Sequence, residues 1–322
     1  MNDKQNAFEI IRFGKPERII MGPPSHGISN FGSNHESPDD EIGHERPLGS
    51  KWKDIWGTEW HKDHEGVMGF PRGNPLADLS ALKSYKWPNP EKYCGQIYKN
   101  AEGWNRDEKF LVGSHRDTLW EKSYMICGME NMMCNFFAEP EAVREILHRI
   151  MDFQMSMAEH YAAAGVEMVS YSDDLGTQSA PLLSPEIVRE FLVPEYRRLF
   201  EFYKKHNVMI NFHSCGHLEP LLEIFMELGI DILNPVQATA NNLEEVRRRT
   251  LGRMALLGGI SSKLISEGTA EQIRTQVRKN ILLLGKDGGY FCNADQGMPW
   301  PKENYDALVK AVEEFGKYPL QN

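Results

Sequence analysis

From about residue 140 onward, segments with the hydrophobic period of a helix alternate with short apolar runs typical of buried strands. The first long helix is expected from Glu139 to Ala164, between a Glu-Pro start and Gly165. The alternation then repeats, with strands expected at 166–174, 208–216, 231–237, 254–260 and 290–295, and helices at 184–207, 218–229, 242–249, 269–285 and 302–316. Five successive β-to-α units predict a parallel sheet.

Two earlier apolar runs, 18–24 and 109–115, extend the series toward eight strands. We therefore predict an α/β fold, a (β/α)8 TIM barrel, in one domain covering residues 1–322. An open, doubly wound sheet is the alternative. Such a sheet usually has a glycine-rich turn after its first strand, and the absence of that turn from the sequence favours the closed barrel.

The segment from about 25 to 106 interrupts this rhythm. It is irregular and rich in tryptophan, with Trp52, Trp56, Trp60, Trp87 and Trp104. A loop of this length inside a compact domain is usually functional. We expect a long N-terminal insertion over the barrel mouth, whose tryptophans either seal the fold or cover a substrate.

The composition excludes several classes of protein. Hydrophobic residues make up 41% of the chain, which is enough for a sizeable core, and the formal net charge is −10. Basic residues are concentrated only at Arg247–Arg249, after two glutamates on a predicted helix, where a solvated face is expected. We therefore expect no nucleic-acid partner and no membrane association. The N-terminus has no signal-peptide pattern, so a cytoplasmic location is expected.

Three residues suggest a metal site. His213 and Cys215 lie at the end of a predicted strand, where residues i and i+2 project to the same side, and Cys292 lies on the last predicted strand. One imidazole and two thiolates suit zinc, and three protein ligands leave a coordination position open, as in catalytic sites. The odd number of cysteines, five, without a secretory signal points to thiols rather than disulfides, and Cys127 and Cys134 are expected in the core.

Other candidates surround the predicted mouth. Asp173 and Asp174 end a strand, where they could cap a helix or act on a substrate, and we assign them a catalytic role. Asp295 and His217 are weaker candidates by the same reasoning. Aromatic and methionine side chains near the site suit either a flat apolar substrate or a plain core: Trp120, Tyr124, Met125 and Met129. We assign substrate binding to His115, Trp120, Tyr124 and Tyr171.

Several runs resemble the uroporphyrinogen decarboxylase superfamily: YSDDLGTQ (171–178), SPE (184–186), HSCGHLEPLLEIFMELGIDILNPVQ (213–237) and LLGGI (256–260). The resemblance covers residues 110–320 well and the N-terminal third more loosely. Its metal-free decarboxylases carry an arginine-rich segment of the type RQAGRYLPEY, which is absent here. Its corrinoid-dependent methyltransferases carry His-x-Cys and a distant Cys as zinc ligands, which match His213, Cys215 and Cys292. Residues 54–90 also resemble the methyltransferase I components of O-demethylases.

The resemblance implies a zinc-dependent methyltransferase. A small methyl donor, expected to be an aryl methyl ether, would place its oxygen at the open zinc position and pass its methyl group to the Co(I) corrinoid (cobalamin) of a partner protein. In relatives of the coenzyme M type, the zinc instead activates a thiol that accepts the methyl group. The same ligands serve both directions, so the sequence leaves both open. A metal-free decarboxylase and a non-catalytic corrinoid- or metal-binding accessory protein are the remaining alternatives.

Overall fold

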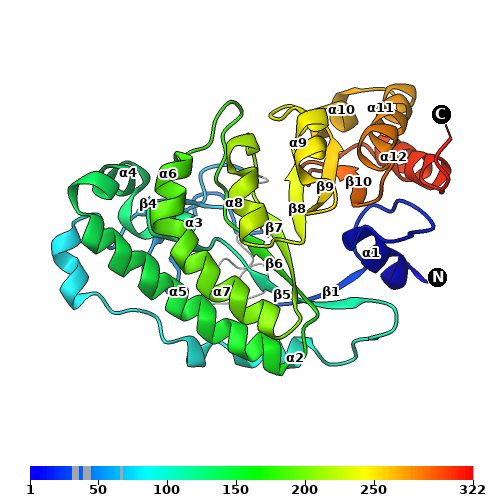
Figure 1. Cartoon of the computed structure of the whole chain (residues 1–322). Helices are drawn as coiled ribbons and strands as arrows, with labels where there is room; N and C mark the ends of the chain where they lie inside the picture. Colours follow the sequence, from blue (N-terminus) through cyan, green and yellow to red (C-terminus); the bar gives the residue numbers. More distant parts are fainter. Residues whose placement is uncertain (31–35, 39–44, 66–67, 322) are drawn as a thin grey trace.

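The computed structural model describes residues 1–30, 36–38, 45–65 and 68–321. Within these residues, seven parallel strands form one curled sheet in the order β1-β5-β6-β7-β8-β9-β10 (Figure 1). The strands are β1 (Ser25–Ile28), β5 (Phe110–His115), β6 (Met168–Ser172), β7 (Met209–His213), β8 (Ile232–Val236), β9 (Ala255–Ile260) and β10 (Tyr290–Ala294). The predicted α/β barrel-type fold is confirmed.

Helices follow the strands and cover the outside of the sheet (Figure 1). They are α3 (Leu119–Cys127), α4 (Met129–Ala138), α5 (Pro140–Ala163), α6 (Pro185–Ile187) with the π turn η3 (Val188–Leu192) and α7 (Val193–Lys205), η4 (Glu219–Leu221) with α8 (Leu222–Glu227), α9 (Leu243–Thr250), α10 (Ser262–Glu267), α11 (Ala270–Leu284) and α12 (Lys302–Phe315). The helices and strands expected after residue 140 are confirmed, and α10 is an additional short helix.

The run 18–24 was expected to be a strand, and it is not one. It passes beside β10, where the Cys292 N–H donates to the Ile20 carbonyl at 3.1 Å, and it leads into β1, which pairs with β5. Pro23 and Pro24 have no N–H to donate to a ladder, so regular pairing begins only at Ser25. This irregular segment therefore links the two edges of the sheet.

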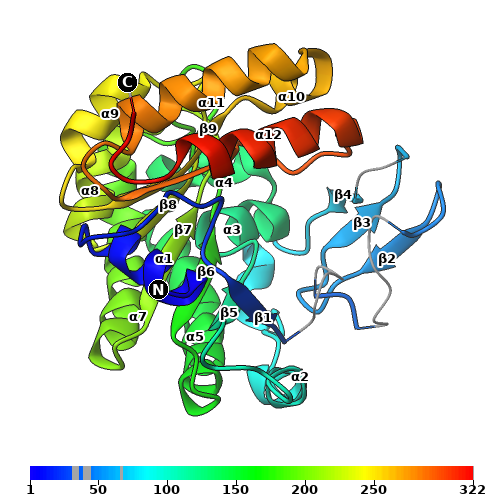
Figure 2. The same ribbon diagram turned by 90° about the vertical axis from the view of Figure 1, so that its right-hand side faces the viewer.

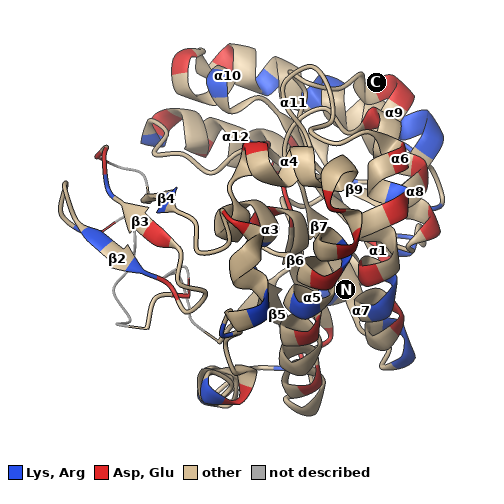
Figure 3. Cartoon of the chain, turned by 90° about the vertical axis from the view of Figure 1, so that its left-hand side faces the viewer, with Lys and Arg blue, Asp and Glu red and all other residues tan. Residues whose placement is uncertain are grey.

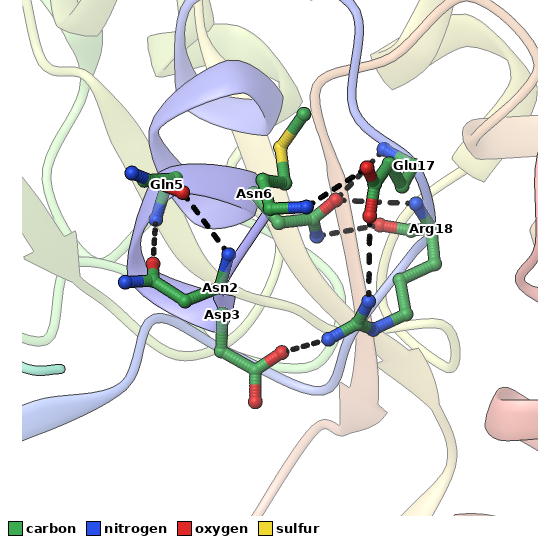
Figure 4. A network of polar contacts seen from close by, with 7 residues as sticks. Asn2, Asp3, Gln5, Asn6, Glu17 and Arg18 are labelled. Atoms are coloured by element: carbon green, nitrogen blue, oxygen red, sulfur yellow. Dashed lines mark hydrogen bonds and ion pairs between the residues drawn. The ribbon is translucent and has the colours of Figure 1, made fainter.

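The bottom of the barrel is closed by the N-terminal helix α1 (Asp3–Ile11). Its Ala7, Ile10 and Ile11 pack against the inward-facing residues of the strands: Phe110, Val112, Met168, Ile232, Ala255, Leu257 and Phe291. Asn6 fixes α1 to the chain that follows, because its side chain accepts from the Glu17 and Arg18 amides and donates to the Arg18 carbonyl (Figure 4). Helix α1 therefore covers the end of the barrel at which the strands begin.

The insertion contains a small antiparallel sheet of β2 (Lys51–Lys53), β3 (Glu59–His61) and β4 (Phe70–Gly73). Trp52 and Trp60 stack on each other and pack against Tyr124 and Met125 of α3. The opposite views of Figures 2 and 3 both show this sheet beside the barrel, so it flanks the mouth instead of crossing it. The chain returns through η1 (Leu79–Ser84), η2 (Pro90–Lys92) and α2 (Gly95–Asn100). Residues 31–35, 39–44 and 66–67 of the expected insertion lie outside the described residues.

The arginine run of α9 makes internal contacts. Arg248 pairs with Glu245 at 2.6 Å, Arg249 donates to the Glu219 carbonyl, and Arg247 is buried against the Gly288 carbonyl. Basic and acidic residues are interspersed along the helices in the ribbon of Figure 3. In the described part of the chain, no helix is both long enough and apolar enough to cross a membrane.

Candidate metal centre

Three potential metal ligands converge at the carboxyl end of the sheet: Asp174, His213 and Cys215. One ligand atom from each, a carboxylate oxygen, an imidazole nitrogen and a sulfur, lies within 4.8 Å of the other two. The Cys215 Sγ is 3.4 Å from the His213 Nε2, which is 3.7 Å from the Asp174 Oδ1. All three side chains are partly exposed, so a ligand can reach them. The structure thus brings together two of the three predicted zinc ligands and one predicted catalytic acid.

Two loops place these residues next to each other. Asp174 follows β6 and Cys215 follows β7, and the Cys215 N–H donates to the Asp174 Oδ1 at 2.8 Å. At Gly176 the two backbones are in direct contact, because a Cβ there would lie 2.5 Å from the Cys215 carbonyl oxygen and 2.8 Å from the His217 nitrogen. Gly216 has φ +90°, which an L side chain rarely adopts. The two glycines thereby set the distance between Asp174 and Cys215.

Replacing Gly176 with alanine is therefore expected to push the two loops apart. The added methyl group meets only backbone atoms, which cannot rotate away, so we expect a loss of about 1–3 kcal/mol in the free energy of unfolding. Metal affinity should fall about 10-fold or more, as when supporting groups of a metal site are removed. Gly27→Ala is the matched control, since nothing lies within 4 Å of its added Cβ. Urea unfolding and metal titration of both variants test this, and equal effects of the two substitutions would contradict it.

The site is strongly acidic. Burial and the nearby Asp174 raise the pKa of the Cys215 thiol to about 12, and burial lowers the pKa of His213 against the opposite effect of Asp174. Glu121 lies close by, and burial together with Asp117, Asp173 and Asp174 raises its pKa. Its Oε2 is buried without a hydrogen-bond partner among the described residues. Burying several carboxylates and a thiol close together costs free energy, because their anionic forms repel one another and lose hydration. A divalent cation between them would offset this cost.

Two glutamines contact the loop that carries Cys215, and neither was predicted as a site residue from the sequence. The Gln296 Nε2 donates to the Cys215 Sγ at 2.9 Å, and the Gln237 Oε1 accepts from the Gly216 N–H at 2.6 Å. Gln237 follows β8 directly, and Gln296 is the second residue after β10. Their signal in the sequence was a polar residue just beyond a strand end, the same signal that pointed to Asp174.

Cys292 does not join this group. Its neighbours along β10 show its direction: Phe291 packs inside the barrel, whereas Tyr290 and Cys292 belong to the core between sheet and helices. The thiol is fully buried, and burial raises its pKa to about 12. The expectation that Cys292 is the third ligand is corrected, since its side chain points away from the interior. Cys127 is in the core as expected, whereas Cys134 is exposed.

Asp173 has a structural place instead of a catalytic one. It is fully buried and accepts hydrogen bonds from the Trp120 and Glu121 amides at 3.0 and 2.9 Å and from the Tyr196 hydroxyl. Asp173 therefore anchors the N-terminus of α3, which is the helix-capping role that the sequence offered as the alternative to catalysis. Burial raises its pKa to about 8. Asp295 is also buried and accepts from the Ser262 amide, and His217 contacts the Ala240 carbonyl.

Three of the four predicted substrate-binding residues are core residues. Trp120 and Tyr171 are fully buried, and His115 is 2% exposed. The His115 side chain extends from β5 toward the helices. Its Nδ1 lies 2.7 Å from the Gln154 Oε1, and its Nε2 lies 2.5 Å from the Tyr203 hydroxyl. Only Tyr124 is partly exposed, and its ring contacts Trp120 and the small sheet. Aromatic residues at these positions fill the core, so the expectation that the three contact substrate is corrected.

The burial of His115 predicts a pH dependence of stability. Burial lowers its pKa to about 4 from the ordinary 6.5, so below pH 6.5 the unfolded chain binds this proton and the folded chain does not. Stability is therefore lost as the pH falls from about 6.5 toward 4, by about 2 kcal/mol at pH 5 relative to pH 7.5. Urea unfolding of the wild type and of His115→Gln at both pH values measures this loss. The variant should lack that part of the loss, and equal losses would refute the assignment.

The upper part of the barrel interior is polar and reached by solvent. Ser114, Ser170, Asn211 and Asn234 are partly exposed, although the residues on either side of each are buried. They lie in register on neighbouring strands, with Ser170 opposite Ser114 and Asn211, and Asn234 opposite His213. The Asn211 Oδ1 is buried and has no hydrogen-bond partner among the described residues. This lining leads from the apolar bottom layer up to His213.

The residues present fit a zinc ion. Carboxylate oxygen, imidazole nitrogen and thiolate sulfur are all zinc donors, and three protein ligands leave one position for a substrate. The two side chains that can ionise to anions, Asp174 and Cys215, balance the charge of a divalent cation. The Gln296 amide already contacts the Cys215 sulfur, as outer partners of metal ligands do.

The chain is similar in sequence to two kinds of enzyme. It is 29% identical over 195 residues to a methylated-thiol–coenzyme M methyltransferase of Methanosarcina mazei, which covers 59% of this chain and 49% of that protein. The chain thus matches about half the length of that relative. It is 22% identical to a uroporphyrinogen decarboxylase of Pseudoalteromonas translucida, over 75% of this chain and 70% of that one.

Among solved structures, a methyltransferase from Methanosarcina mazei has the same fold. The TM-score is 0.73 at 16% sequence identity, over 98% of this chain and 99% of the other. The family model for uroporphyrinogen decarboxylase (URO-D) matches residues 75–315, which include every strand from β5 to β10 and the candidate metal centre. The chain therefore belongs to the uroporphyrinogen decarboxylase family.

Proposed function

We propose that this chain is a zinc-dependent methyltransferase that moves a methyl group between a small polar compound and a corrinoid carried by a separate protein. The convergence of Asp174, His213 and Cys215 at the barrel mouth carries the proposal. These three residues would hold the zinc. When bound, the ion would act as a Lewis acid that stabilises the negative charge left on the heteroatom from which the methyl group departs, or that promotes deprotonation of a thiol that accepts it.

The chain's own residues would select and position the substrate. The partly exposed Ser and Asn side chains below His213 offer hydrogen bonds to a substrate. Such a lining suits a small polar methyl ether or methylated thiol better than the flat aryl ether expected from the sequence, because three of the four residues proposed to hold an aryl ring are in the core. The relative that acts on methylated thiols supports the thiol class.

The acidic character of the mouth argues against the alternative, a decarboxylase for a substrate with many carboxylates. Beside His213, the carboxylates of Asp117, Glu121 and Asp174 interact with one another, and Arg116 pairs with Asp117 at 3.6 Å. Three acids thus stand against one cation there, and the interior lining is neutral. A polyanionic substrate would be repelled there unless cations faced it. A partner protein that carries the corrinoid and a cytoplasmic location stay predictions.

The experiment is a methyl-transfer assay on the full chain with its metal content measured. Purified protein is incubated with a reduced corrinoid protein and a panel of small methyl ethers, methylated thiols and aryl methyl ethers, and the reverse reaction is assayed with small thiols. We expect about one zinc at the mouth and turnover with a member of the small polar group. Turnover with uroporphyrinogen, or full methyl transfer by metal-free protein, would overturn the proposal.

A further inference from the structure

A second group of metal-type ligands lies outside the barrel: Glu91, Cys94 and His160. One ligand atom from each lies within 4.8 Å of the other two. Glu91 belongs to η2, Cys94 precedes α2, and His160 is in the last turn of α5. Because α5 ends just before β6 begins, this group lies toward the N-terminal ends of the strands, at the opposite end from the candidate metal centre.

Neighbouring groups hold these ligands in place. The His160 Nε2 is 3.2 Å from the Glu91 Oε1, while its Nδ1 is 2.8 Å from the Tyr98 hydroxyl. The Ser156 hydroxyl donates to the same Glu91 oxygen at 3.1 Å. Hydrogen bonds of this kind, to the second nitrogen of an imidazole and to a carboxylate, orient the ligands of metal sites.

The donor chemistry and the charge suit a divalent zinc ion. Nitrogen, sulfur and carboxylate oxygen are its three common protein donors. Cys94 is a free, half-buried cysteine, and the partial exposure of the group leaves room for water as a fourth ligand. His160 lies at the C-terminal end of a 24-residue helix, where the helix dipole favours positive charge.

We propose that Glu91, Cys94 and His160 bind a zinc ion that fastens the end of the insertion to α5. Glu91 and Cys94 come from the segment that returns from the insertion to β5, and His160 comes from the barrel, so the ion joins the two parts of the fold. This site does not depend on the metal at the barrel mouth or on the methyltransferase proposal.

The test uses the full chain carrying Cys215→Ser, which removes a ligand of the mouth site, after treatment with a chelator. Titration with Co²⁺ alone, followed by its thiolate charge-transfer absorption, should show about one ion per chain, displaced by Zn²⁺. Adding Cys94→Ser or His160→Gln should weaken binding at least 10-fold, whereas Cys134→Ser, at an exposed cysteine outside both described ligand groups, should not change it. No thiolate absorption, or binding unchanged by Cys94→Ser, would overturn the proposal.

A second measurement leaves the proposed ligands intact. In Cys215→Ser protein, alkylation of Cys94 by iodoacetamide is followed by mass spectrometry with and without Zn²⁺. Zinc should slow the alkylation of Cys94 at least 10-fold and leave that of Cys134 unchanged. Equal alkylation of Cys94 in both conditions would refute the site, whatever the mouth binds.

Discussion

Protein with Cys215→Ser is expected to be purified without zinc at the barrel mouth and to lose methyl transfer. Serine keeps the size of the side chain but replaces a soft thiolate donor with a hydroxyl, which is a poor zinc ligand. Lewis-acid catalysis supplies several kcal/mol, and each 1.4 kcal/mol is a factor of ten, so we expect kcat to fall at least about 100-fold. Elemental analysis and the methyl-transfer assay give the two readouts, and circular dichroism checks the fold.

Cys292→Ala is the matched control, because the two cysteines were predicted from the sequence as ligands of the same ion. The Cys292 thiol points into the core, so its loss should cost about 1 kcal/mol of stability and leave the zinc content unchanged. Asp174→Asn should weaken zinc binding, since it removes the charge of the third ligand in the structure. If Cys292→Ala lost the zinc and Asp174→Asn kept it, the ligand set inferred from the structure would be wrong.

The difference between these two cysteines shows what strand periodicity can predict. In MINFH the polar residues Asn211 and His213 alternate with apolar ones, so the inward face of β7 is visible in the sequence. In YFC both faces of the strand are buried and all three residues are largely apolar, so no alternation reveals the direction of Cys292. The same limit applies to Asp173 and Asp174, adjacent residues of which one anchors a helix and the other reaches the mouth.

The fold could be predicted where helices and strands are long. The helix α5 and the strands β6 and β7 have periodic patterns that match their burial, whereas β9 and β10 are visible in the sequence as short apolar runs. The strands of the small sheet are three or four residues long, which is too short for a period. Their positions depend on tryptophan contacts with α3, and contacts between distant segments leave no local pattern.

Lys122→Met is expected to destabilise the protein by about 3–5 kcal/mol, since it leaves buried carboxylates without their cation. Lys122 of α3 is 1% exposed and its Nζ lies 2.6 Å from the Glu36 Oε2. Burial alone would lower its pKa, but Glu36 and Asp54 outweigh burial and raise it, so the amine is charged. Asp54 accepts from the Trp60 Nε1 at 2.9 Å, and Trp56 donates to Glu36 at 2.6 Å.

This cluster joins the insertion to the barrel, so the loss should appear first in the tryptophan-rich part of the chain. Urea unfolding followed by tryptophan fluorescence and by circular dichroism measures the loss and its location. The double variant Lys122→Met with Glu36→Gln should recover part of the stability, because it removes one of the unpaired charges. Lys302→Met is the surface control: Lys302 is exposed and its partner Asp306 is partly exposed, and surface pairs contribute about 0–1 kcal/mol. A loss at Lys122 no larger than at Lys302 would mean that the buried cluster does not hold the insertion in place.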